Sequence, residues 1–241
     1  MSALASRADR VLVESHHPLD NVIWNALTTR HSELAFGGQT ARRYDPAYTP
    51  FAGTADTSPQ SLAALEGITR VGDEIIVLST APIRLPSSFD RVDPGDVLQM
   101  TVAHIDATAT RHTHLTLEAS DAGDMRQLVA ETRPGPFSHR THEMGRFLGV
   151  RSDGRLVAMA GERVRLEGFT EISGVCSSAT HRGRGLPAEL VRAVARGILA
   201  RGETPFLHVF AHNRAAVALY RKLGFEIRRK MCVAMLRRRA R

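Results

Sequence analysis

The sequence feature that most constrains the fold of this chain is a pair of closely spaced glycines at a predicted strand-to-helix junction. Residues 181–186, HRGRGL, follow a strand-like run over 171–176 and precede a strongly helical run over 187–200. Because glycine has no Cβ, Gly183 and Gly185 permit a tight turn and a close approach of the backbone to a ligand. The first amides of the next helix lack partners and carry the positive end of its dipole. We therefore expect an anion, above all a pyrophosphate, to bind here.

The spacing of these glycines does not fit the two common phosphate loops. A Walker loop needs G-x-x-x-x-G-K-[ST], and the sequence has no such run. A dinucleotide fingerprint needs G-x-G-x-x-G in the first strand–helix unit. Here Gly183 and Gly185 are followed by Ala188 and lie late in the chain. The pyrophosphate is therefore expected to belong to a different kind of cofactor.

A second segment, residues 213–225, predicts a helix followed by a strand. It reads NRAAVALYRKLGF. Asn213 is a good N-cap, Gly224 ends the helix, and Phe225 opens the strand. Four side chains recur on one helical face: Ala216, Leu219, Tyr220 and Leu223.

Together the two segments resemble the GNAT superfamily of acyl-CoA-dependent N-acyltransferases. The second matches every named position of the family's N-x-x-A-x-x-L-Y-x-K-x-G-F segment. The first is similar to the family's [QR]-x-x-G-x-[GA] pattern. Pro187 departs from it at the sixth position and removes one amide donor, although proline suits the first turn of a helix. The first five positions of the pattern are taken by Arg182, Gly183, Arg184, Gly185 and Leu186.

The resemblance implies an α/β fold, with a mixed, strongly twisted sheet and helices on both faces. Residues 111–241 are expected to form this catalytic GNAT domain. Residues 1–110 are expected to form a smaller, divergent α/β domain, degenerate and GNAT-like, as in the glycine N-acyltransferase-like branch of the family. We expect that half to help shape the acceptor cleft. Several terminal strands are expected after the helix at 213–224.

Glu171 is the predicted base that takes a proton from the acceptor amine. It lies eleven residues before Arg182, the offset at which many GNAT enzymes carry a glutamate on a strand. The strand period of two places it on one face with Ser173 and Val175. On a largely apolar strand its pKa is expected to be raised. The alternative interpretation is a structural glutamate paired with a neighbouring arginine.

The resemblance implies roles for four further residues. Tyr220 is the predicted acid that protonates the departing thiolate, since a phenol has an ordinary pKa near 10; alternatively it is a core aromatic. Val175 and Cys176 are expected to bind the pantetheine arm and the acyl oxygen through their backbone. The Cys176 side chain is expected to be a small core residue and not a nucleophile. Asn213 is expected to contact the pantetheine arm, a role compatible with helix capping.

Charge is unevenly divided along the chain. Residues 1–110 carry 8 arginines against 13 acidic residues, and residues 111–241 carry 24 basic against 12 acidic residues. The basic half contains the glycine loop, as a polyanionic cofactor requires. The sequence isoelectric point of about 10.3 also raises a nucleic-acid interpretation. Aromatic residues are few and no zinc, helix-turn-helix or RNA-recognition motif occurs, so no nucleic-acid partner is expected.

Other sequence patterns limit which cellular compartment and which cofactors are expected. No run of 18 uncharged apolar residues occurs, and the first ten residues lack the apolar stretch of a signal peptide, so a cytoplasmic protein without a membrane partner is expected. The two cysteines do not indicate a disulfide framework. Several of the 11 histidines have ligand-like spacings, as in His208 and His212, but no cysteine or acidic cluster accompanies them, so no metal is expected.

The sequence thus predicts an N-acetyltransferase that moves an acetyl group from acetyl-CoA to a primary amine by direct transfer. The acceptor is expected to be a small molecule or a peptide, and the enzyme a monomer or homodimer. The alternative is a non-catalytic module that binds or senses acyl-CoA. Retention of both Glu171 and Tyr220 favours the enzyme.

Overall fold

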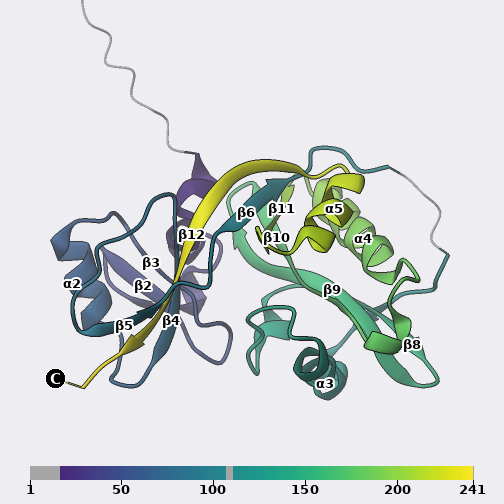
Figure 1. Ribbon diagram of the computed structural model, residues 1–241, viewed down its shortest axis with the longest axis horizontal. Coiled ribbons are helices and arrows are strands. Elements are labelled where there is room, and N and C mark those ends of the chain that lie inside the picture. The colour runs from purple at the N-terminus through teal and green to yellow at the C-terminus, as the bar shows by residue number, and fades with distance from the viewer. Residues whose placement is uncertain (1–16, 107–110, 241) are drawn as a thin grey trace, which may run out of the picture.

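The protein, described here by a computed structural model for residues 17–106 and 111–240, consists of two lobes joined by long strands (Figure 1). The first lobe contains a three-stranded antiparallel sheet flanked by helices. Its elements are the α-helices α1 (Val22–Thr28) and α2 (Pro59–Gly67) and the strands β1 (Ala35–Gly37), β2 (Ala41–Tyr44) and β3 (Ala52–Thr54). Short 3₁₀ helices lie at Pro18–Asn21, Ser32–Leu34, Ala119–Asp121, Thr141–Met144 and Ala179–His181.

The main sheet has nine strands and extends from the second lobe into the first (Figure 1). Its order is β4-β12-β6-β11-β10-β9-β8-β7, and β5 pairs with β12. Its strands are β4 (Glu74–Ser79), β5 (Phe89–Val92), β6 (Val97–Thr101), β7 (Leu115–Leu117), β8 (Phe147–Ser152), β9 (Arg155–Leu166), β10 (Phe169–Ser177), β11 (Thr204–Phe210) and β12 (Glu226–Arg238).

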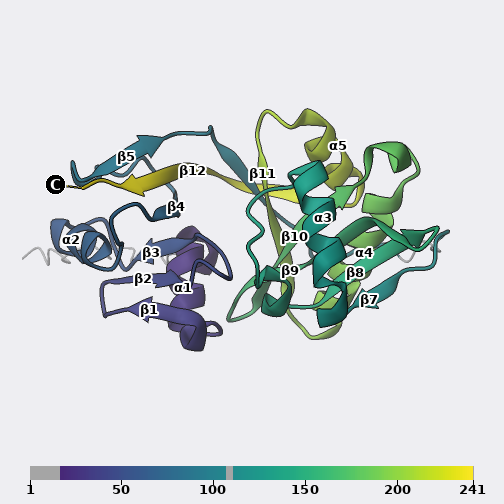
Figure 2. The same cartoon turned by 90° about the horizontal axis from the view of Figure 1, so that it is seen from below.

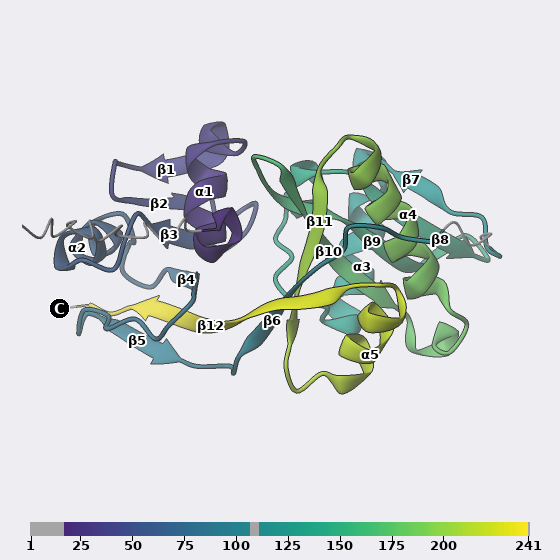
Figure 3. The ribbon, with the colours of Figure 1, turned by 90° about the horizontal axis from the view of Figure 1, so that it is seen from above.

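Helices cover both faces of this sheet. The helix α3 (Ala122–Thr132) lies on the face seen from below (Figure 2). The helices α4 (Leu186–Ala200) and α5 (Arg214–Lys222) lie on the face seen from above (Figure 3). All neighbouring strands pair antiparallel except β10 and β11, which are parallel. The predicted mixed α/β sheet with helices on both faces is confirmed.

Strand pairing crosses the boundary predicted at residue 110. The strand β6, from the first half, lies between β11 and β12, which both come from the second half. One long terminal strand, β12, follows α5 where several were predicted, and it pairs first with β6 and then with β4. The division of the chain into domains at 1–110 and 111–241 stays a prediction. Strands from both halves belong to the same sheet.

An apolar core also holds the two lobes together. Side chains of α1 pack with residues of β9 and β11, so the first lobe covers part of the sheet face opposite α4. Each buried aliphatic side chain of this kind contributes about 1.5–3 kcal/mol. The core includes Val22, Ile23, Leu27, Val164, Leu166 and Phe206. None of the helices in the described residues has both the length and the apolar character needed to cross a bilayer.

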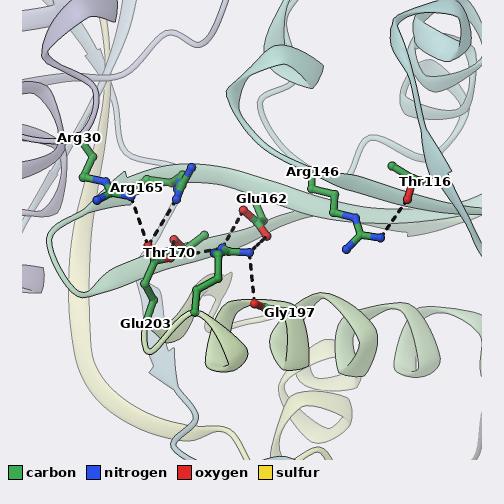
Figure 4. A network of polar contacts seen from close by, with 9 residues as sticks. Arg30, Thr116, Arg146, Glu162, Arg165, Thr170, Gly197 and Glu203 are labelled. Atoms are coloured by element: carbon green, nitrogen blue, oxygen red, sulfur yellow. Dashed lines mark hydrogen bonds and ion pairs between the residues drawn. The ribbon is translucent and has the colours of Figure 1, made fainter.

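The helix α4 is fixed at its C-terminal end by a network of charged side chains (Figure 4). Arg201 donates from both terminal nitrogens to Glu162 at 3.0 Å and also to the carbonyl oxygen of Gly197. It further contacts Glu203, which accepts a hydrogen bond from Thr170 at 2.6 Å. Because Glu162 lies on β9, these hydrogen bonds fix this end of α4 to the sheet, and the guanidinium also stands at the negative end of the helix dipole. The opposite end of α4 carries the glycine loop.

Candidate cofactor and acyl-transfer site

The sheet opens between β10 and β11. These strands share only three residue pairs, the last being Glu171 with Phe206. Both strands continue, β10 to Ser177 and β11 to Phe210, without further mutual pairing in the described residues. Backbone polar groups on their facing edges therefore lack a ladder partner beyond Glu171 and are available to a ligand.

A bulge in β10 changes which side chains face the opening. The register with β9 shifts between Ser173 and Cys176, and Gly174 has φ +64°. Ile172 and Val175 consequently pack into the same core beneath α4, although they are three residues apart. Glu171, next to Ile172, points to the other face. The prediction that Glu171 and Val175 share a face is wrong, because the bulge inserts an extra residue into the alternation.

The glycine loop lies between β10 and the N-terminus of α4, which confirms the predicted strand-to-helix junction. Gly183 and Gly185 have φ of +76° and +80°, a conformation that side-chain-bearing residues rarely adopt. A Cβ at either position would meet no atom within 4 Å, so the backbone conformation, and not crowding, requires glycine. Arg182 and Arg184 are exposed on the same loop, which ends in the first turn of α4 with Pro187. The loop thus presents free amides and two cations to solvent.

Tyr220, on α5, and Cys176, on β10, are both buried. The Tyr220 side chain is largely buried, with its ring edge against Phe225. Burial, with a smaller effect from Cys176, raises the pKa of Tyr220 to about 12. Burial also raises the pKa of the Cys176 thiol to about 11, which keeps it protonated and unsuited to nucleophilic attack.

Glu171 is buried in an ion pair. Arg163 donates to its carboxylate from Nε at 2.9 Å and from Nη2 at 3.0 Å, and His208 Nδ1 lies 2.9 Å from Oε1. Burial alone would raise the pKa of this carboxyl. The charge of Arg163 and the hydrogen bonds from His208 and Arg163 outweigh burial and lower the pKa to about 2. The predicted upward shift is therefore wrong, and the geometry is that of the alternative, a glutamate paired with an arginine.

Arg163 connects this carboxylate to other parts of the molecule. It donates to the carbonyl oxygen of Pro136 at 3.0 Å, and its guanidinium lies 4.8 Å from the centre of the Phe51 ring. Sequence reasoning missed Arg163 and considered His208 only as a metal ligand. The charge pattern offered one signal, since Arg163 stands only eight residues before Glu171, and the two residues lie on strands that pair antiparallel, β9 and β10.

The remaining predicted residues occupy separate places. Asn213 Oδ1 accepts the N–H of Ala216 at 3.2 Å, which confirms the predicted N-cap. Contacts of Asn213, Val175 and Cys176 with a pantetheine arm stay predictions. In the described residues no three His, Cys, Asp or Glu side chains are grouped as a metal ion would require.

Comparison with known proteins places this geometry in a family. The FR47-like protein family matches residues 147–234. A GNAT-family structure from Novosphingobium aromaticivorans DSM 12444 has 39% sequence identity and a TM-score of 0.87, covering 93% of this chain and all of its own. A GCN5-related N-acetyltransferase from Kribbella flavida shares the fold, with 15% identity and a TM-score of 0.62 over 89% of this chain and 92% of that one.

A curated relative is similar over a shorter region. N-alpha-acetyltransferase RimI from Mycobacterium tuberculosis is 37% identical over 83 residues, which are 33% of this chain. The match spans about half of that relative, 51% of its length. The similarity to the Novosphingobium protein, by contrast, extends over the whole of that chain and 93% of this one. This chain belongs to the GNAT family of acetyltransferases.

Proposed function

We propose that this protein is an N-acetyltransferase that moves an acetyl group from acetyl-CoA directly to a primary amine. One observation carries the proposal: the opening between β10 and β11 leads along a single segment into the exposed glycine loop and the first turn of α4. In the proposal the cofactor pyrophosphate binds the amides between Gly183 and Leu186, aided by Arg182 and Arg184. The pantetheine arm then runs along the free edge of β10 at Val175 and Cys176.

Transfer requires one bond to form and one to break. The amine nitrogen attacks the thioester carbonyl, whose oxygen is stabilised by backbone N–H groups on the edge of β10. The carbon–sulfur bond then breaks, and the thiolate takes the phenolic proton of Tyr220. A pKa of about 12 keeps this phenol protonated at neutral pH, so the proton is available when the thiolate forms. The phenolate regains its proton from solvent, and the proton from the amine leaves through water.

Glu171 needs a separate assignment within this reaction. The sequence predicts it as the base, but a carboxylate with a pKa of about 2 and three hydrogen bonds is a weak proton acceptor. We therefore propose a positioning role, in which Glu171 holds β10 where the opening begins. A direct role as base would require its pairing with Arg163 and His208 to open first.

The acceptor is proposed to bind between the lobes. The loop between α3 and β8 packs on the first lobe, where the Arg140 N–H donates to Ala47 at 2.7 Å and its guanidinium lies 4.4 Å from the Tyr48 ring centre. These contacts support a role for the first lobe in shaping the acceptor cleft, as in the glycine N-acyltransferase-like branch. Because one relative is named an N-alpha-acetyltransferase, peptide N-termini belong in the acceptor screen beside amino acids and small amines.

Binding is tested with two matched glycine variants at opposite ends of α4. Gly185 and Gly202 have φ of +80° and +76°, and a Cβ would meet nothing at either. Alanine should therefore cost both variants a similar 1–2 kcal/mol of stability, as a rough guide. Acetyl-CoA should raise the melting temperature of wild type and Gly202→Ala, whereas Gly185→Ala should bind roughly 10-fold more weakly or worse. Equal affinities in the two variants would move the pyrophosphate away from this loop.

A second function, a non-catalytic acyl-CoA-binding module, is favoured by one observation. Glu171, the predicted base, is buried and fully paired. Thiol release from acetyl-CoA in the presence of an amine panel separates the two functions. The proposed enzyme releases thiol with at least one acceptor, in amounts equal to the acetylated amine. A binder is stabilised by acetyl-CoA but releases none.

A further inference from the structure

Gln99 on β6 lies within a chain of polar side chains that connects the two halves of the molecule. Its amide nitrogen lies 3.0 Å from the carbonyl oxygen of Leu19 and 3.1 Å from His208 Nε2. Its oxygen accepts a hydrogen bond from Arg228 Nε at 2.6 Å, and Arg228 also pairs with Asp20. Gln99 is fully buried, so its donors and acceptors must find their partners inside the protein.

The partners of Gln99 allow only one orientation of its amide. Arg228 has only donors, so it must face the amide oxygen. The Leu19 carbonyl can only accept, so it must face the amide nitrogen. The nitrogen that also faces His208 Nε2 is therefore a donor, and Nε2 must carry no proton.

Glu171 fixes the other ring nitrogen. His208 Nδ1 lies 2.9 Å from Glu171 Oε1, and an ionised carboxylate can only accept. The proton of the imidazole is therefore on Nδ1, and the ring is neutral. The groups that surround it are Glu171 with Arg163 behind it, Gln99 with Arg228 behind it, and the Phe206 ring at 5.6 Å.

We infer that Gln99 is a positioning residue for acyl transfer, acting through the tautomer of His208 on Glu171. The inference rests on the proposed function. The hydrogen bond from His208 to Glu171 joins β11 to β10 directly beyond the last backbone pair, Glu171 with Phe206. The opposite tautomer would turn an acceptor toward the carboxylate, and a doubly protonated ring would turn a donor toward the donor of Gln99. Gln99 thus selects the ring state that closes this link and defines where the opening begins.

The tautomer is measured in the full-length protein labelled with ¹⁵N-histidine. Long-range ¹H–¹⁵N correlation spectra distinguish a protonated from an unprotonated ring nitrogen, and a His208→Asn sample assigns the signal. The wild type should show a protonated Nδ1 and an unprotonated Nε2. In Gln99→Glu, a carboxylate replaces the donor, so His208 should take a second proton at neutral pH. A proton on Nε2 in the wild type, or an unchanged ring in Gln99→Glu, would overturn the inference.

Kinetics separate positioning from general structural damage. Gln99→Glu should lower kcat by about 10-fold with little change in KM for acetyl-CoA. Gln99→Met keeps the volume, and Glu171 still requires the Nδ1 proton, so its kcat should fall less. Gln127→Glu, exposed on α3, adds the same charge elsewhere and should change neither the spectrum nor kcat. Equal losses of kcat in both Gln99 variants, or no loss in either, would contradict the positioning role.

The proposed acetyltransferase function and the role of Gln99 are contradicted by different results. Absence of acetylation with every amine would contradict the proposed function and, with it, a positioning role in transfer. An active wild type with the opposite tautomer would contradict only the assignment of Gln99.

Discussion

The two ends of β10 differ in how their polar groups are satisfied. At its start, the Glu171 carboxylate is buried and accepts three hydrogen bonds from Arg163 and His208. Past its end, residues 182–185 are exposed, in the loop that leads into the first turn of α4. A carboxylate that already accepts three hydrogen bonds has little remaining capacity for a ligand, whereas an unpaired N–H is available to one. The comparison teaches that the position of a carboxylate in a sequence does not make it a base, because its partners decide its role.

The largest expected effect tests the start of β10, where the Glu171 carboxylate is paired. Glu171→Gln removes a buried charge and leaves Arg163 unpaired, which should lower the free energy of unfolding by about 3 kcal/mol. Chemical denaturation measures the loss. Glu167→Gln, in the exposed turn just before β10, is the matched control and should change stability by less than about 0.5 kcal/mol. If Glu171→Gln instead keeps its stability and loses turnover that rising pH restores, Glu171 is the base.

The same ion pair predicts a pH dependence. The pKa of Glu171 falls from its ordinary 4.5 to about 2 in the folded state, so ionisation of this carboxyl stabilises the fold. The stability difference between wild type and Glu171→Gln should be full above pH 4.5 and narrow as the pH falls toward 2. A gap that stays constant over this range would show that the carboxylate gains nothing from Arg163.

A somewhat smaller effect is expected at Tyr220, the proposed proton donor, and tests the part of the site where the cofactor is proposed to bind. Tyr220→Phe keeps the ring but removes the proton donor, so turnover should fall by about 10²-fold while acetyl-CoA affinity changes little. Tyr44→Phe is the matched control, because its buried hydroxyl is hydrogen-bonded to His31 at 2.9 Å. It should lose stability and keep its turnover. Full activity in Tyr220→Phe would reduce Tyr220 to a core aromatic.

Local sequence patterns predicted the second lobe well. The junction at 181–186 and the cap at Asn213 depend on glycine conformation and on a side chain reaching three residues along the chain. Such short-range chemistry is visible in a sequence. The mixed sheet and the family followed from these two segments.

Long-range pairing explains what the sequence did not reveal. The bulge at Gly174 is not visible in an alternating pattern, yet it separates Glu171 from the face of Val175. The low pKa of Glu171 depends first on Arg163, on the neighbouring strand, and then on His208, 37 residues away in the chain. Likewise, β6, from the first half of the chain, lies between β11 and β12, because strand order is set by packing between distant segments.

Hydrogen exchange with and without acetyl-CoA compares both ends of β10 in one measurement. We predict that saturating acetyl-CoA slows exchange of the amides in residues 182–188 by roughly 10-fold or more, since binding must be undone before they exchange. Residues 163–166 and 170–171, which lie in paired strands and are largely buried, should exchange slowly and equally in both states. Unchanged exchange at 182–188, with protection appearing elsewhere, would contradict the assignment of the glycine loop as the cofactor site.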